Sequence, residues 1–68
     1  MKTQKELLKR LQKEYPQYDV RIRMCSWGGY SIDFNKVSVA TSGKLKVLIS
    51  FYETGWLKQL IKDNGFNI

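Results

Sequence analysis

The chain contains no histidine, and only one of its 68 residues is a cysteine, Cys25. Without histidine, a serine, threonine or cysteine nucleophile lacks its usual base, which argues against catalytic triads of the common kind. The six acidic residues are scattered and show no spacing that pairs two carboxylates or gathers several metal ligands. The sequence therefore predicts a protein with no enzymatic activity, no cofactor and no metal.

Long apolar runs are missing as well. No stretch approaches the roughly 20 apolar residues that cross a bilayer, and the first residues lack the pattern of a secretory signal. Because the lone Cys25 cannot form an internal disulfide, a reducing, cytoplasmic setting is expected, with no membrane partner. At 68 residues the chain makes one small domain (1–68) without room for an enclosed cavity, so no small-molecule substrate is expected. Nothing in the sequence indicates the oligomeric state.

Positive charge, in contrast, is abundant. Twelve lysines and arginines face six aspartates and glutamates, which gives a net charge of +6. Such an excess favours anionic partners and argues against a mimic of DNA.

The first residues predict a helix that ends near Glu14. Thr3 followed by Glu6 has the spacing of a capping box, and the Tyr15-Pro16 pair ends the run because proline biases the preceding residue away from helical angles. The apolar side chains of this segment fall on one face. Lysines line the other face, which we interpret as an ordinary solvated surface rather than a nucleic-acid stripe: Lys2, Lys5, Lys9 and Lys13.

The segment from Asp19 to Phe34 predicts a β-hairpin with a basic outer side. Two runs alternate apolar and polar residues on either side of a Trp27-Gly28-Gly29-Tyr30 turn. We attribute both glycines to positive φ angles in this turn, because no helix and no Lys-Ser/Thr pair follows as in a phosphate loop.

The second half predicts one strong strand and one helix. Val37 and Val39 either continue the second strand or form a short strand of their own, and residues 41–43 read as a turn. Residues 44–51 alternate apolar with mostly polar side chains and predict a strand. A last helix is expected from about Thr54 to residue 63, with Gly65 as its C-terminal cap and Phe66 folded back onto Ile61.

These elements predict an α+β domain of order α-β-β-β-α. Both amphipathic helices need an apolar surface, which the inward side of a three-stranded antiparallel sheet supplies, so both are expected on one sheet face. The residues expected to share the core are Leu11, Ile22, Ile32, Val47, Trp56 and Leu60.

The open face of that sheet is the candidate binding site. Strand periodicity places four cations there, where they could meet phosphates along a nucleic-acid backbone: Arg21, Arg23, Lys44 and Lys46. Ser31, Asp33 and Asn35 are expected among them, and Asp33 is expected to form a surface ion pair with a neighbouring cation. A polar outer face of this kind also discourages edge-to-edge aggregation, which is the alternative interpretation.

Trp27 and Tyr30 are the candidate aromatic contacts. In a tight turn Trp27 is either exposed, where it stacks on a base or anchors a protein partner together with Tyr30, or folded back over the sheet edge or a helix end. The sequence favours neither alternative.

Part of the chain resembles a known family. Glu6-Leu-Leu-Lys-Arg-Leu-Gln-Lys-Glu-Tyr-Pro, Asp19-Val-Arg-Ile-Arg and Gly28-Gly-Tyr-Ser-Ile-Asp look like a small domain associated with large polyvalent proteins of bacteriophages and conjugative elements. The resemblance covers residues 6–34. It implies a phage or mobile-element protein acting inside a bacterial host cell, and it carries over no active site.

Two functional hypotheses follow. In the first, the basic sheet face engages nucleic acid or a nucleoprotein. In the second, the domain is a small inhibitor or modulator of a host or phage protein, such as a defence or replication enzyme, with Trp27 and an exposed Leu48 as anchors.

Overall fold

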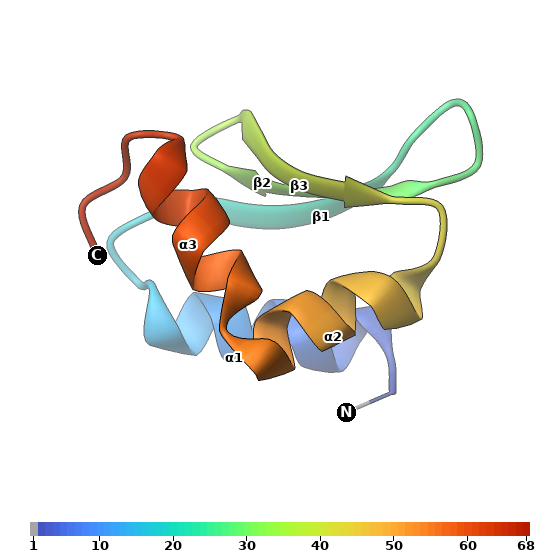
Figure 1. Ribbon diagram of the computed structural model, residues 1–68, viewed down its shortest axis with the longest axis horizontal. Coiled ribbons are helices and arrows are strands. Elements are labelled where there is room, and N and C mark those ends of the chain that lie inside the picture. The colour runs from blue at the N-terminus through green and yellow to red at the C-terminus, as the bar shows by residue number, and fades with distance from the viewer. Residues whose placement is uncertain (1) are drawn as a thin grey trace.

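The computed structural model describes residues 2–68 and confirms the α+β fold of order α-β-β-β-α. All helices lie on one face of an open three-stranded antiparallel sheet with strand order β1-β2-β3 (Figure 1). The last helical part consists of two helices. The elements are α1 (Gln4–Glu14), β1 (Val20–Met24), β2 (Tyr30–Phe34), β3 (Val37–Ser42), α2 (Leu45–Thr54) and α3 (Trp56–Asp63).

Helix α1 begins as the sequence predicts. The Thr3 side chain accepts a hydrogen bond from the backbone N–H of Glu6 at 3.2 Å, and the Glu6 carboxylate accepts one from the Thr3 hydroxyl, also at 3.2 Å. Thr3 thereby satisfies one of the N–H groups that a helix start leaves unpaired. Leu7 and Leu11 are fully buried against the sheet.

The β1–β2 hairpin is confirmed, and in it Ile22 lies opposite Ile32 and Arg21 opposite Asp33. The question left open for Val37 and Val39 is resolved in favour of a separate strand, because β3 pairs antiparallel with β2 after a tight turn. Asn35 and Lys36 in that turn have φ values of 51° and 68°, the left-handed angles that suit a two-residue hairpin loop.

The predicted strand over residues 44–51 is wrong, because this segment is helix α2. Apolar residues stand at five of its eight positions and satisfy a helical period as well as an alternating one. The sheet obtains its third strand from residues 37–42 instead, including Thr41 and Ser42, which the sequence assigned to a turn. Leu48, expected outside, is completely buried.

Helices α2 and α3 are separated by a sharp bend at Gly55, whose φ of 82° is left-handed and therefore suits glycine. Helix α3 ends at Asp63, as predicted. Gly65 has a φ of 89°, and the Phe66 backbone N–H returns to the carbonyl of Ile61 at 3.3 Å.

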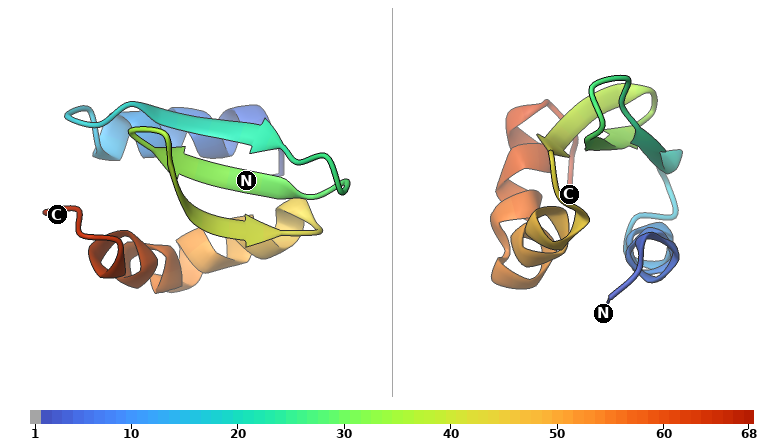
Figure 2. Two further views of the ribbon diagram at one scale, coloured as in Figure 1. Left: turned by 90° about the horizontal axis from the view of Figure 1, so that it is seen from above. Right: turned by 90° about the vertical axis from the view of Figure 1, so that its right-hand side faces the viewer.

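The core lies between the sheet and the helices. Helix α1 packs along β1, while α2 and α3 pack along β3 (Figures 1 and 2). Leu11, Ile22 and Ile32 are buried as predicted, but Val47 and Leu60 are half-buried and Trp56 is 54% exposed. At the end where α1 finishes, Phe34 is fully buried within an aromatic cluster that also contains Tyr15, Tyr18 and Phe66.

Candidate nucleic-acid interface

Arg21 and Arg23 lie on the open sheet face, as predicted, but both are paired with carboxylates. Arg21 Nε lies 3.2 Å from Asp19 Oδ1, and Arg23 Nε lies 2.7 Å from Asp33 Oδ2. The hydrogen bond that Arg23 Nε donates to the Asp33 carboxylate raises the pKa of the guanidinium above its ordinary value. Each arginine therefore already has a carboxylate partner within the protein.

Asp33 also belongs to a hydrogen-bond network across the sheet. The Ser31 hydroxyl donates to Asp33 Oδ1 at 2.7 Å and lies 2.8 Å from the Ser38 hydroxyl. Ser31 is fully buried and Asp33 is 8% exposed. The predicted ion pair of Asp33 with a neighbouring cation is confirmed, and the centre of the open face is satisfied without a ligand.

Lys44 and Lys46 do not lie on the sheet, so the predicted four-cation cluster is wrong. Because residues 45–54 are helical, both lysines stand at the start of α2, where Lys44 is the N-cap residue. Lys44 supplies no side-chain cap to the helix, and its backbone N–H donates to the Ser42 hydroxyl at 3.3 Å. Both lysine residues are exposed.

Tyr30 and Trp27 do not form a joint aromatic surface. Tyr30 shares the strand face of Ile32 and Phe34, so it packs half-buried on the helix side, opposite the arginines. Trp27 is 62% exposed. Its ring nevertheless folds back over the turn, since a Cβ built on Gly29 would lie 2.1 Å from the ring. Both alternatives for Trp27 therefore hold in part.

The fold brings the Trp27 ring against Gly43, just before the start of α2. A Cβ on Gly43 would lie 3.8 Å from the Trp27 ring, and Gly43 directly precedes Lys44. Figure 2 (right) shows that the β1–β2 turn, the start of α2 and the start of α1 share this end of the molecule. We call the surface formed by the β1–β2 turn and the start of α2 the basic end and define it by Trp27, Lys44 and Lys46.

The lysines of the basic end are free to meet an anion. Among residues 2–68, the ion pairs are those made by Arg21 and Arg23. The sequence contains one signal for the position of Lys44 and Lys46 at a helix start. Lys44-Leu-Lys46 follows Ser42-Gly43 directly, and a helix can begin in this way after a turn.

No group of three or more Cys, Asp or Glu side chains in residues 2–68 could hold a metal ion. Over the same range, no helix has the length and apolar character of a membrane span. Cys25 is partly exposed at the end of β1, with Arg23 Nη1 at 3.9 Å from its sulfur.

Comparison of the chain with protein-family models, curated proteins and solved structures gives no match. The resemblance to the phage-associated domain therefore stays a prediction.

We expect Gly29→Ala to destabilise the protein because of close contact rather than backbone angle. Positive φ explains Gly28, at 93°, but the Cβ of an alanine at position 29 would lie 2.1 Å from the Trp27 ring and 2.7 Å from the Ser42 carbonyl oxygen. Such overpacking costs about 1–3 kcal/mol, measurable by urea denaturation. Gly43→Ala is the matched control, with its nearest contact at 3.8 Å. Equal stability of the two variants would contradict this packing of Trp27.

Proposed function

We propose that this chain is a non-enzymatic protein of phage or mobile-element type that binds nucleic acid through its basic end. The observation that carries the proposal is an exposed tryptophan, Trp27, whose ring lies against Gly43 just before the start of α2, where Lys44 and Lys46 are exposed and form no ion pair within residues 2–68. The binding surface proposed here differs from the open sheet face, where Arg21 and Arg23 are engaged by aspartates.

The charges of the basic end suit a phosphate backbone. Lysine ammonium groups on exposed helical positions can neutralise phosphates without losing an internal partner, and each contact releases condensed counterions. The positive end of the α2 dipole adds to the field of Lys44 and Lys46. The N-cap residue provides no side-chain cap that would occupy the backbone N–H groups at this helix start. The net charge of +6 supports long-range attraction of the same partner.

Trp27 supplies a second kind of contact. Its ring rests on one side against Gly29 and still leaves 62% of the residue exposed. An aromatic face held in this way can stack on a base, which contributes about 1–3 kcal/mol by alanine substitution. Because Tyr30 faces the helices, the basic end has a single aromatic side chain and no extended stacking platform. This favours backbone binding with little dependence on base sequence.

The alternative, an inhibitor of a host or phage protein, loses part of its support. It was to use Trp27 and Leu48 as anchors, but Leu48 is 0% exposed and cannot contact a partner. Trp27 remains available to it.

Fluorescence anisotropy with labelled duplex and single-stranded DNA and RNA tests the proposal. We expect binding at low salt, with log affinity falling against log salt by about 0.9 per phosphate contact on duplex DNA. In a Trp56→Phe background Trp27 is the one tryptophan, so quenching of its fluorescence on binding reports contact at the basic end. No measurable binding to any of these nucleic acids at about 50 mM salt would remove the proposal.

A further inference from the structure

The two outer edges of the sheet differ in regularity. β3 carries the bulge that shifts its pairing between Ile32 and Asp33 of β2, and a bulge hinders the addition of a further strand. β1 pairs regularly with β2 along all five of its residues. A regular edge strand presents a row of backbone donors and acceptors that another strand can join, so β1 is the edge that needs protection.

The hydrogen bonds at the two ends of β1 show which of its backbone groups point away from the sheet. At one end the Asp19 carbonyl accepts from the Asn35 N–H at 2.9 Å. At the other end the Cys25 N–H donates to the Gly29 carbonyl at 2.7 Å. Alternate residues of an antiparallel strand turn their N–H and C=O groups to the same side. The outward groups of β1 therefore belong to the residues at even positions: Val20, Ile22 and Met24.

Two glutamine side chains of α1 occupy outward carbonyls of β1. Gln12 Nε2 donates to the Val20 carbonyl at 3.4 Å, and Gln4 Nε2 donates to the Ile22 carbonyl at 3.3 Å. The two acceptors lie two residues apart, which is the interval at which a neighbouring strand would bond to this edge. The side-chain amides therefore take the place of the backbone N–H groups of a further strand.

The backbone of α1 does not itself cover the β1 edge. The helix lies beneath β1 in both views of Figure 2. A hollow of about 330 Å³ opens between helix and strand, lined by Leu8 and Gln12 on one side and by residues 19–22 on the other. Within residues 2–68, the hydrogen bonds that join α1 to β1 are those of Gln4 and Gln12.

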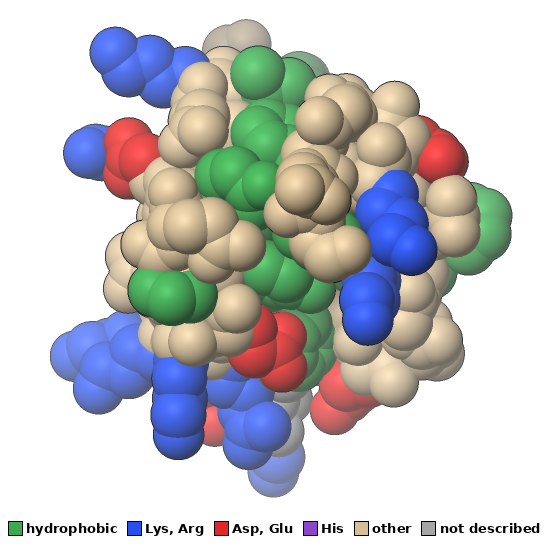
Figure 3. Space-filling model, turned by 90° about the vertical axis from the view of Figure 1, so that its left-hand side faces the viewer, with side chains coloured by type: hydrophobic (Ala, Val, Ile, Leu, Met, Phe, Trp, Pro, Cys, Tyr) green, Lys and Arg blue, Asp and Glu red, His purple; other side chains and the backbone are tan. Residues whose placement is uncertain are grey.

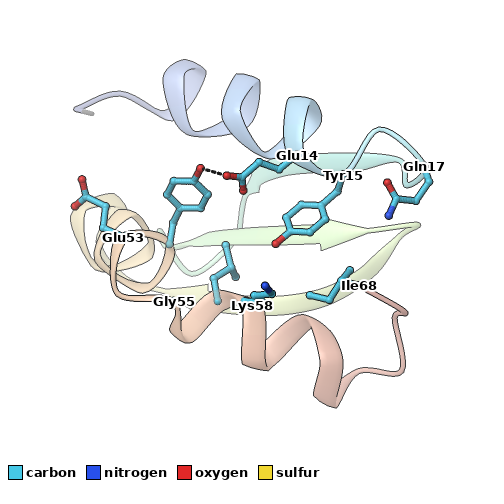
Figure 4. A pocket seen from close by; sticks show the side chains of 9 residues that line it. Glu14, Tyr15, Gln17, Glu53, Gly55, Lys58 and Ile68 are labelled. Carbon is cyan, nitrogen blue, oxygen red and sulfur yellow. Dashed lines mark hydrogen bonds between the residues drawn. The ribbon is translucent and has the colours of Figure 1, made fainter.

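Other contacts hold α1 in place without these glutamines. Leu7 and Leu11 are fully buried against the sheet. On the side that faces α2, the Glu14 carboxylate accepts a hydrogen bond from the Tyr52 hydroxyl at 2.7 Å (Figure 4). Neither glutamine belongs to the buried core, so we expect the fold to survive their replacement.

We infer that Gln4 and Gln12 guard the β1 edge against pairing with the β1 strand of a second copy of this chain. Symmetric antiparallel pairing centred on Ile22 would place Val20 of one copy opposite Met24 of the other and would bond the outward groups of both strands. Because the glutamines already engage two carbonyls of each β1 strand, N–H groups of the incoming strand would be left without acceptors. The glutamines thereby keep the chain monomeric. The inference concerns neither the basic end nor nucleic-acid binding.

Sedimentation equilibrium of the double variant Gln4→Met/Gln12→Met tests the inference. Methionine keeps the length and helix propensity of glutamine but has no N–H donor. In about 0.5 M salt, which screens the arginines of two facing β1 strands, we expect the variant to dimerise at least about tenfold more tightly than the unmodified chain. Hydrogen exchange of the amides of Val20, Ile22 and Met24 should slow on dimerisation, because these N–H groups gain acceptors.

The double variant Gln17→Met/Gln59→Met is the matched control. It places two methionines at exposed positions whose side chains form no hydrogen bond with β1, and we expect it to stay monomeric. If circular dichroism showed that the first double variant does not fold, Gln12→Met, at an exposed position, would be compared with Gln17→Met in its place.

Three results would overturn the inference. The first is a folded variant without Gln12 that remains as monomeric as the unmodified chain, and the second is equal association of the control. The third is dimerisation that leaves the exchange of the β1 amides unchanged. That result would assign the contact to another surface, such as the apolar strip that Figure 3 shows on the end of the molecule opposite the basic end.

Discussion

Phe34→Ala should abolish most of the cooperative folding of this domain at 37 °C. Phe34 is fully buried at the end of β2, and its ring lies 5.4 Å from that of Tyr15, 5.8 Å from that of Tyr18 and 5.7 Å from that of Phe66. Removing a buried phenylalanine costs about 3–5 kcal/mol, because apolar contacts are lost and a cavity remains. A domain of this length has a total stability of roughly 3–10 kcal/mol.

Urea denaturation and thermal melting by circular dichroism measure the loss. Trp56→Ala is the control, because it removes a larger aromatic side chain that is 54% exposed and should cost under about 1 kcal/mol. If the two variants were equally stable, the aromatic cluster would not be the centre of the core at this end. Tyr18→Phe isolates the smaller contribution of the Tyr18 hydroxyl, which donates to the Asn67 carbonyl at 2.8 Å.

The first half of the fold could be predicted from sequence because its signals are local and agree with one another. Thr3 and Glu6 start a helix, and Pro16 lies just beyond its end. Strict alternation over 20–24 and 30–34 fixes which side chains of the hairpin face the core. The third strand was harder to predict. Val37–Ser42 contains a β-bulge, since Ile32 pairs with Ala40 but Asp33 pairs with Ser38, and this interrupts the alternation.

Residues 44–51 show why periodicity failed in the second half. Leu45, Leu48, Ile49 and Tyr52 have the spacing of a helix face, yet Val47 and Phe51 complete an alternating pattern as well. Such an apolar-rich segment is decided by tertiary context. Once β3 has completed the sheet, α2 must cover its apolar face, and Leu48 becomes part of the core.

That single error moved the candidate site. With residues 44–51 as a strand, Lys44 and Lys46 joined Arg21 and Arg23 on the sheet. With the helix, they stand at the start of α2 instead, directly after Gly43, which the Trp27 ring approaches. The residue types were informative, but their grouping depended on long-range pairing. The hydrogen bond that Arg21 donates to Asp19 was also not predicted from the sequence.

The double variant Lys44→Gln/Lys46→Gln should nearly abolish nucleic-acid binding without changing stability. Both lysines are exposed and take no part in an ion pair within residues 2–68. If each contacts one phosphate of duplex DNA, the slope of log affinity against log salt should shrink by about 1.8, and affinity near 0.1 M salt should fall roughly a hundredfold. Anisotropy titrations across a salt series measure both quantities.

A control with the same net charge decides whether position or total charge matters. Arg21→Gln/Lys62→Gln also removes two cations, but from an arginine already paired with Asp19 and from the last turn of α3. Arg23 is left intact because its guanidinium satisfies the nearly buried Asp33. We expect this control to weaken binding less than threefold, through the long-range field alone. Equal losses in the two double variants would show that the protein attracts nucleic acid by overall charge, and that the basic end is not a defined binding site.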